Sequence, residues 1–136
     1  MIPLNINTNL GLLIMRLGVG GLMLIHGLSK IAGGIGAVKY LVESAGLPSF
    51  LAYGVYVGEV IAPVMILIGL RTRIAAAIMA VNCLAAVFMY HPDGFLALNA
   101  TGGWSLELIV LFLMGAVALF FTGAGRYALS RRSIWD

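Results

Sequence analysis

Four long stretches of apolar residues run along the chain, separated by short segments that contain glycine, proline and charged residues. They cover residues 10–31, 49–70, 74–90 and 104–121. A bilayer core about 30 Å thick needs about 20 apolar residues per helical span. Backbone polar groups have no water partner in lipid, so spans of this length should be helices. The pattern predicts an all-α integral membrane protein, a four-helix bundle in which residues 1–136 form one transmembrane domain.

The connections between these stretches contain residues that end helices. Residues 32–48 are rich in glycine and end in Gly-Leu-Pro, and residues 71–73 (Arg-Thr-Arg) form a tight turn. The segment His-Pro-Asp-Gly at 91–94 opens a polar loop before the fourth stretch. Because these connections are short, we expect neighbouring helices to be antiparallel.

The composition supports membrane insertion and excludes several classes of protein. Hydrophobic residues make up 62% and charged residues 10% of the chain, and a soluble monomer with so little polar surface could not cover itself. The single cysteine, Cys83, excludes an internal disulfide and a dithiol relay. Nucleotide-binding and zinc-hydrolase motifs are missing, so no metal is expected. The basic residues form no nucleic-acid footprint.

The distribution of basic residues predicts the orientation in the membrane, since cytoplasmic loops carry an excess of Lys and Arg. With four spans, both termini lie on one side, and that side holds five arginines, whereas the opposite side holds Lys39, with Lys30 at the end of a span. The five are Arg71, Arg73, Arg126, Arg131 and Arg132. We therefore expect a multi-pass protein of a bacterial-type cytoplasmic (inner) membrane with both termini in the cytoplasm.

Six polar side chains within or at the ends of the spans are candidates for ligand binding or proton handling. They are Arg16, His26, Lys30, Glu59, Asn82 and Glu107. Charged groups at membrane depth are costly, so they are usually paired or functional. The first three share one face of the first helix, because residues four apart differ by about 40° around the axis. Glu59 lies at the midplane, Asn82 lies near it, and Glu107 lies at about the depth of His26. We expect these groups to form a polar stripe inside the bundle.

Each candidate also has a purely structural interpretation. Arg16 with Glu59 is either a buried ion pair that fixes helix register or part of a site. For His26 the partner is Glu107 or Glu59, and a histidine beside a carboxylate favours a function because it can titrate near neutral pH. Lys30 is expected to be an interfacial lysine, and Asn82 a contact between helices.

Small residues and a proline surround Glu59 in the second span. Gly54 and Gly58 form a Gly-x-x-x-Gly run, which lets another helix approach closely or forms the face of a homodimer. Pro63, four residues after Glu59, has no N–H and frees the carbonyl of Glu59. We therefore expect a kink beside a carboxylate at the midplane.

The ordered series of short motifs resembles the DoxX family of membrane proteins. The motifs are residues 12–18 (LLIMRLG), 24–30 (LIHGLSK), 46–48 (GLP), 58–59 (GE), 67–73 (LIGLRTR), Glu107 and residues 123–129 (GAGRYAL). The resemblance implies a small four-span bundle. Some members are similar to membrane subunits of thiosulfate:quinone oxidoreductases, and others are implicated with partner redox proteins in thiol and oxidative-stress homeostasis.

The resemblance and the polar stripe together predict a membrane subunit that binds a lipid-soluble quinone or a similar apolar ligand. It would support an oxidoreductase complex in redox, thiol or thiosulfate metabolism, with electrons carried by the quinone or a redox partner subunit. His26 and Glu107 would hydrogen-bond the head of the ligand, and Glu59 and Arg16 would set the local charge and pass protons. One alternative is a non-catalytic membrane scaffold or assembly factor. A third hypothesis is a small proton-coupled transporter built as a dimer.

Overall fold

The computed structural model describes residues 7–90 and 94–136, and their regular structure is helical. The helices are α1 (Thr8–Gly33), α2 (Gly36–Ser44), the 3₁₀ helix η1 (Ser49–Tyr53), α3 (Gly54–Tyr56), the π-helix η2 (Val57–Ile61), α4 (Ala62–Ile68), α5 (Thr72–Met89) and α6 (Glu107–Thr122). Within the described residues the one β-type pairing is an isolated bridge between Leu98 and Trp104. The predicted all-α membrane fold is confirmed.

Among the described residues, three helices are long and apolar enough to cross a membrane. They are α1, the continuous run Ser49–Ile68 that joins η1 to α4, and α5. Helix α6 is also apolar, but its 16 residues span about 24 Å, somewhat less than a bilayer core. The helix limits lie within three residues of the predicted spans, and a fourth span through α6 stays a prediction.

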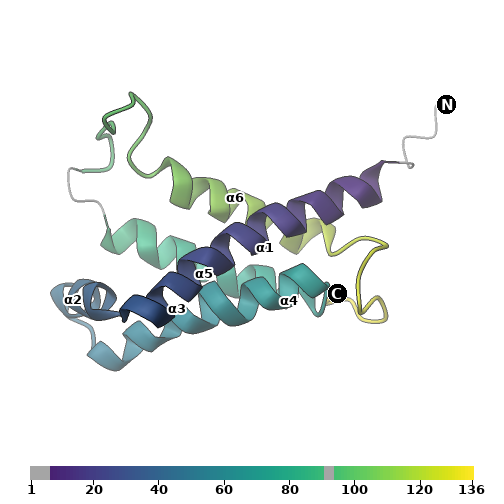
Figure 1. The fold of residues 1–136 in the computed structure, drawn as a ribbon, viewed down its shortest axis with the longest axis horizontal. Coiled ribbons are helices and arrows are strands. Elements are labelled where there is room, and N and C mark those ends of the chain that lie inside the picture. Colours follow the sequence, from purple (N-terminus) through teal and green to yellow (C-terminus); the bar gives the residue numbers. More distant parts are fainter. Residues whose placement is uncertain (1–6, 91–93) are drawn as a thin grey trace.

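The long helices pack around one apolar core (Figure 1). Helix α5 lies against α6, and α1 packs on α4 and η2 and crosses α6. The core contains small side chains such as Ala62, Ala75 and Ala116, which are fully buried, beside larger ones such as Met79 and Ile66. Small residues at the contacts allow helix backbones to approach closely in a membrane protein.

The segment predicted as a glycine-rich linker, residues 32–48, contains a short helix that the sequence pattern missed. Helix α2 lies between Gly34 and Gly46, which both have a positive φ. Val42 of α2 packs with Ala52 and neighbouring residues in a second small apolar cluster. Helix α2 has nine residues, so its pattern of apolar positions is too short to be recognised in the sequence. A helix this short is stabilised by its tertiary contact rather than by its own sequence.

The connection before α6 is a folded turn. Residues 91–93, which begin the predicted polar loop, lie outside the described residues. In the remainder, the Asn99 carboxamide oxygen accepts hydrogen bonds from the N–H groups of Thr101 and Gly103. Its amide nitrogen donates to Glu107 at the start of α6, at 3.4 Å. Asn99 therefore links this turn to the helix that follows it.

Candidate functional site

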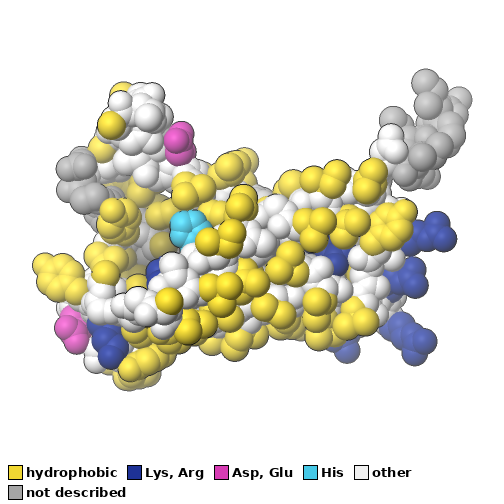
Figure 2. Space-filling model, in the orientation of Figure 1, with side chains coloured by type: hydrophobic (Ala, Val, Ile, Leu, Met, Phe, Trp, Pro, Cys, Tyr) yellow, Lys and Arg dark blue, Asp and Glu magenta, His cyan; other side chains and the backbone are white. Residues whose placement is uncertain are grey.

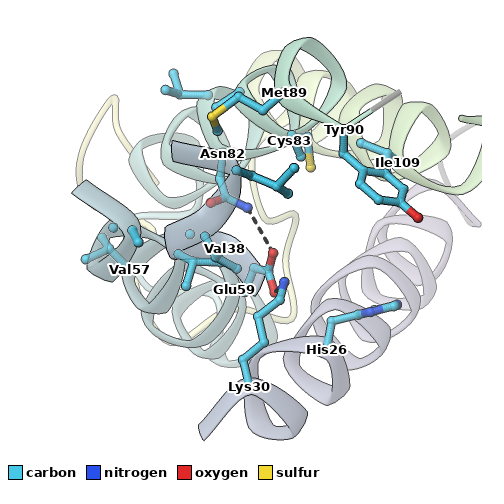
Figure 3. A pocket seen from close by; sticks show the side chains of 18 of the residues that line it. His26, Lys30, Val38, Val57, Glu59, Asn82, Cys83, Met89, Tyr90 and Ile109 are labelled. Atoms are coloured by element: carbon cyan, nitrogen blue, oxygen red, sulfur yellow. Dashed lines mark hydrogen bonds and ion pairs between the residues drawn. The ribbon is translucent and has the colours of Figure 1, made fainter. Parts of the chain in front are cut away.

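A cavity of about 930 Å³ lies between α1, α2, the η1–η2 segment, α5 and α6 (Figure 3). Its walls are mostly apolar. Four of the six predicted site residues line it: His26, Lys30, Glu59 and Asn82. A largely apolar cavity with a few convergent polar groups is typical of small-ligand sites, and this volume lies within their usual range of about 300–1,000 Å³.

Lys30 and Glu59 form an ion pair in the cavity. The Lys30 Nζ lies 2.5 Å from Glu59 Oε2, and the side chains are 29% and 8% exposed. The second carboxylate oxygen of Glu59, Oε1, accepts a hydrogen bond of 3.3 Å from the Asn82 amide (Figure 3). Both oxygens of Glu59 are thus engaged, whereas the Lys30 ammonium has two further N–H donors with no protein acceptor in the described part of the chain.

Lys30, for which the sequence predicts an interfacial position, is the partner of Glu59 in the structure. Its aliphatic stem reaches from α1 into the bundle and places the ammonium against the carboxylate. The Tyr56 hydroxyl donates a hydrogen bond of 3.4 Å to the backbone carbonyl of Lys30 and so links the same turn of α1 to α3. An ion pair away from water needs such close geometry, because otherwise desolvation exceeds the Coulombic gain.

The backbone around Glu59 is irregular, as Pro63 predicts. Residues 57–61 form a π-helix that ends just before α4, and Pro63 lies within the first turn of α4. Because proline has no N–H, the carbonyl of Glu59 has no donor at the i+4 position. Short π-helical segments are frequent at functional sites. The π-helix contains Glu59 and two residues on either side of it.

Two glycines allow the neighbouring helices to reach Glu59. A Cβ atom on Gly27 of α1 would lie 2.2 Å from the carbonyl oxygen of Glu59, and one on Gly58 would lie 2.4 Å from the Asn82 Cβ of α5. Sequence analysis did not single out Gly27, although Gly20 and Gly27, seven residues apart on one helix face, were a detectable signal. Gly58 packs within the chain, whereas Gly54 is open, and a homodimer through these residues stays a prediction.

His26 and Glu107 are not brought together. His26 is exposed at the rim of the cavity, and its ring packs edge-on against Phe112, with 5.7 Å between ring centroids. The carboxylate of Glu107 is exposed, lies outside the cavity lining and accepts the hydrogen bond from Asn99. Of the two, the structure associates His26 with the cavity.

Arg16 does not pair with Glu59 and lies outside the cavity lining. It is 1% exposed, and its guanidinium donates to four backbone carbonyls. These are Ile66 at 2.8 Å, Leu67 at 2.7 Å, Ala124 at 3.2 Å and Tyr127 at 2.5 Å. Arg16 therefore joins the end of α4 to the segment after α6, which is a structural role.

Charged groups at the two ends of the molecule have their own partners. Lys39 of α2 donates a hydrogen bond to the Tyr53 hydroxyl at 3.1 Å, and this bond raises the pKa of Lys39. Burial alone would raise the pKa of Asp136, but hydrogen bonds from Ser130, Ser133 and Arg132 outweigh it and lower that pKa. These contacts order the chain near its C-terminal end.

Comparison with known proteins gives the same family as the ordered motifs of the sequence. The family model described as DoxX matches residues 11–92, the region that contains Lys30, Glu59 and Asn82. The chain is 32% identical over 126 residues to "Putative oxidoreductase CatD" of Bacillus subtilis. This alignment covers 93% of this chain and 89% of that protein.

Two further relatives carry no assigned activity in their names. A Haemophilus influenzae protein is 32% identical over 129 residues, covering 87% of this chain and 87% of its own length. A Mycobacterium tuberculosis membrane protein is 29% identical over 130 residues, covering 86% of this chain and 77% of its own length. No solved structure matches the chain significantly. The match to the family model and the extent of these similarities show that the chain belongs to the DoxX family.

Proposed function

We propose that this protein is a membrane subunit that binds a lipid-soluble quinone, or a similar apolar ligand with a polar head, and supports an oxidoreductase complex. The observation that carries the proposal is the Lys30–Glu59 ion pair in a largely apolar cavity of about 930 Å³. The name of the Bacillus subtilis relative gives separate support for a redox role.

The chemistry of the cavity suits a head group that accepts hydrogen bonds. Lys30 has two N–H donors that Glu59 leaves free, and a quinone carbonyl is an acceptor that such a donor can bind. Asn82 holds the other oxygen of Glu59, so the carboxylate stays fixed while Lys30 engages the ligand. When bound, a quinone supplies a two-electron, two-proton acceptor, which this chain with its single buried cysteine lacks.

The electrons must come from a partner redox subunit, and the chain contributes binding and local charge. Glu59 balances the ammonium of Lys30, which makes a neutral ligand preferable to an anionic one because the site has no uncompensated positive charge. His26 at the rim adds a second polar group near the entrance. In this proposal Arg16 and Glu107 are not ligand-binding residues.

The orientation belongs to the same proposal. Lys and Arg side chains gather at the end of the bundle that holds the C-terminus (Figure 2). By the positive-inside rule, we expect both termini in the cytoplasm of a bacterial-type inner membrane. The cavity is lined by α2 and the start of the second span, so it lies toward the opposite, periplasmic side.

The test is mass spectrometry of an organic extract from gently purified protein. We expect a stoichiometric quinone or related lipid in the wild type, lowered at least tenfold in Lys30→Met and Glu59→Gln. Glu107→Gln is the matched control, because its carboxylate is exposed outside the cavity and the extract should be unchanged. If the extract holds only bulk phospholipid in every sample, ligand binding is refuted and the scaffold hypothesis replaces it.

A further inference from the structure

Helices α1 and α6 touch closely at one point and leave a gap beyond it. A Cβ atom on Gly115 of α6 would lie 2.6 Å from the Val19 Cγ2 of α1, so the two helices cross there. Further along, Met23 and His26 of α1 and Leu108 of α6 all line the cavity. The cavity therefore extends between the two helices, from their crossing toward the start of α6.

The cavity reaches the surface of the bundle in this gap. His26 and Leu108 line it and are also exposed, Leu108 at 49%. The surface is hollowed beside the histidine in Figure 2. We call the opening bounded by His26, Leu108 and Phe112 the α1–α6 window. Its edges belong to two helices, whereas its floor contains the Lys30–Glu59 pair.

The window lies at the depth of the hydrocarbon core. His26 is between five and six residues from the midpoint of α1, which corresponds to about 8 Å along the helix axis. Half of a bilayer core is about 15 Å. An opening at this depth, with the exposed apolar side chain of Leu108 at its edge, faces acyl chains when the protein is in a membrane.

We propose that the α1–α6 window is a lateral entrance through which a long-chain amphiphile passes from the bilayer into the cavity. The head of the amphiphile reaches Lys30, and its apolar chain extends out between His26 and Leu108 into the surrounding lipid. The proposal rests on the proposed function, since it concerns the ligand of the same cavity. It narrows the ligand to a lipid with a hydrogen-bond-accepting head and one long chain, and it excludes a water-soluble solute.

Cys83 provides a reporter of access, because it is the chain's single cysteine and lines the cavity while being 2% exposed. Its thiolate displaces methanesulfinate from a methanethiosulfonate and forms a mixed disulfide, which intact mass detects. Two reagents of the same chemistry are compared in reconstituted vesicles, with each reagent added to both sides. One is the apolar methyl methanethiosulfonate, and the other is the anionic 2-sulfonatoethyl compound.

We expect the apolar reagent to modify Cys83 at least tenfold faster than the anionic one, after each rate is divided by its rate with a free thiol. Leu108→Trp should fill the window and slow the apolar reagent at least tenfold. Leu111→Trp is the matched control, because Leu111 is 68% exposed on the same helix but does not line the cavity, and its rate should equal that of the wild type.

Three results would overturn the proposal: equal rates for the two reagents, an unchanged rate in Leu108→Trp, or no modification of the folded protein by either reagent. Modification after unfolding in detergent confirms that Cys83 itself is reactive. If Leu108→Trp does not fold, Leu108→Phe and the comparison of reagents on the wild type decide the question. The assay contains no ligand, so failure of the proposed function leaves its outcome unchanged.

Discussion

The contact between Gly27 and Glu59 gives the sharpest test of how the cavity is built. In Gly27→Ala, the added Cβ would lie 2.2 Å from the Glu59 carbonyl oxygen and 2.7 Å from its carbonyl carbon, whereas ordinary contact begins at 3.4 Å. Helix α1 and the π-helix would have to separate by about 1.2 Å at this point. The obstacle is backbone, so it cannot rotate away as a flexible side chain would.

The expected loss of stability follows from two opposing effects. Overpacking of a well-packed interior costs about 1–3 kcal/mol. Replacing a glycine inside a helix by alanine returns about 0.5–1 kcal/mol, because alanine loses less conformational entropy on folding. The overpacking cost exceeds the entropic gain over most of these ranges, so we expect Gly27→Ala to lower the free energy of unfolding by up to about 2.5 kcal/mol. The separation also pulls Lys30, one turn further on, away from Glu59, so ligand content should fall.

The assay is reversible unfolding in mixed micelles with increasing dodecyl sulfate, followed by circular dichroism. Gly18→Ala is the matched control, since it lies on the same helix and a Cβ there would meet nothing within 4 Å. Gly18→Ala should leave the free energy of unfolding unchanged or raise it by about 0.5–1 kcal/mol. The reasoning is refuted if Gly27→Ala is as stable as Gly18→Ala, because α1 would then not contact the Glu59 backbone as described.

Three further predictions concern the other end of the molecule. Arg16→Met should lower the free energy of unfolding by about 3 kcal/mol or more, measured in the same assay, because four carbonyls lose their donor. Arg16→Lys should recover only part of this, since an ammonium cannot reproduce the guanidinium fork, and full recovery would contradict the proposed role. Because the pKa of Asp136 is lowered in the folded protein, its stabilising contacts are fully present above its unfolded pKa of about 3.9 and are lost as pH falls through the lower folded value. Hydrogen exchange of residues 130–136, compared with the intrinsic rate at each pH, should therefore show less protection below about pH 4 in the wild type, and this loss of protection should be absent in Asp136→Asn. A green fluorescent protein joined after Asp136 should fluoresce and an alkaline phosphatase there should be inactive, and active phosphatase would contradict the proposed orientation.

The helices could be predicted from the sequence because membrane insertion depends on length and apolarity, which a single chain displays directly. The predicted limits of the second and third spans, 49–70 and 74–90, differ from the observed helices by no more than two residues. Helix α2 could not be predicted in the same way. It is short, it is bounded by two glycines with positive φ, and its stability comes from packing on η1.

The set of candidate residues was also visible in the sequence, but the partners within that set were not. Depth along each helix suggested Arg16 for Glu59, and it suggested Glu107 as one partner for His26. Depth says nothing about rotation or crossing angle, and α1 meets the second span at Gly27, one turn from Lys30. The close approach at this glycine brings Lys30, not Arg16, to the carboxylate.

Arg16 and Lys30 lie on one helix, yet their hydrogen-bond partners differ for a physical reason. Helix α4 ends at Ile68, before Gly69 in the left-handed conformation, and the last carbonyls of a helix have no donor within it. The Arg16 guanidinium has five N–H groups in a planar fork, and it satisfies two of these carbonyls and two beyond α6. Four of these five N–H groups thus donate to protein carbonyls, and the side chain is buried outside the cavity lining. Lys30 gives one N–H to Glu59 and keeps two toward the cavity, so of the two cations on α1 it alone can bind a ligand head.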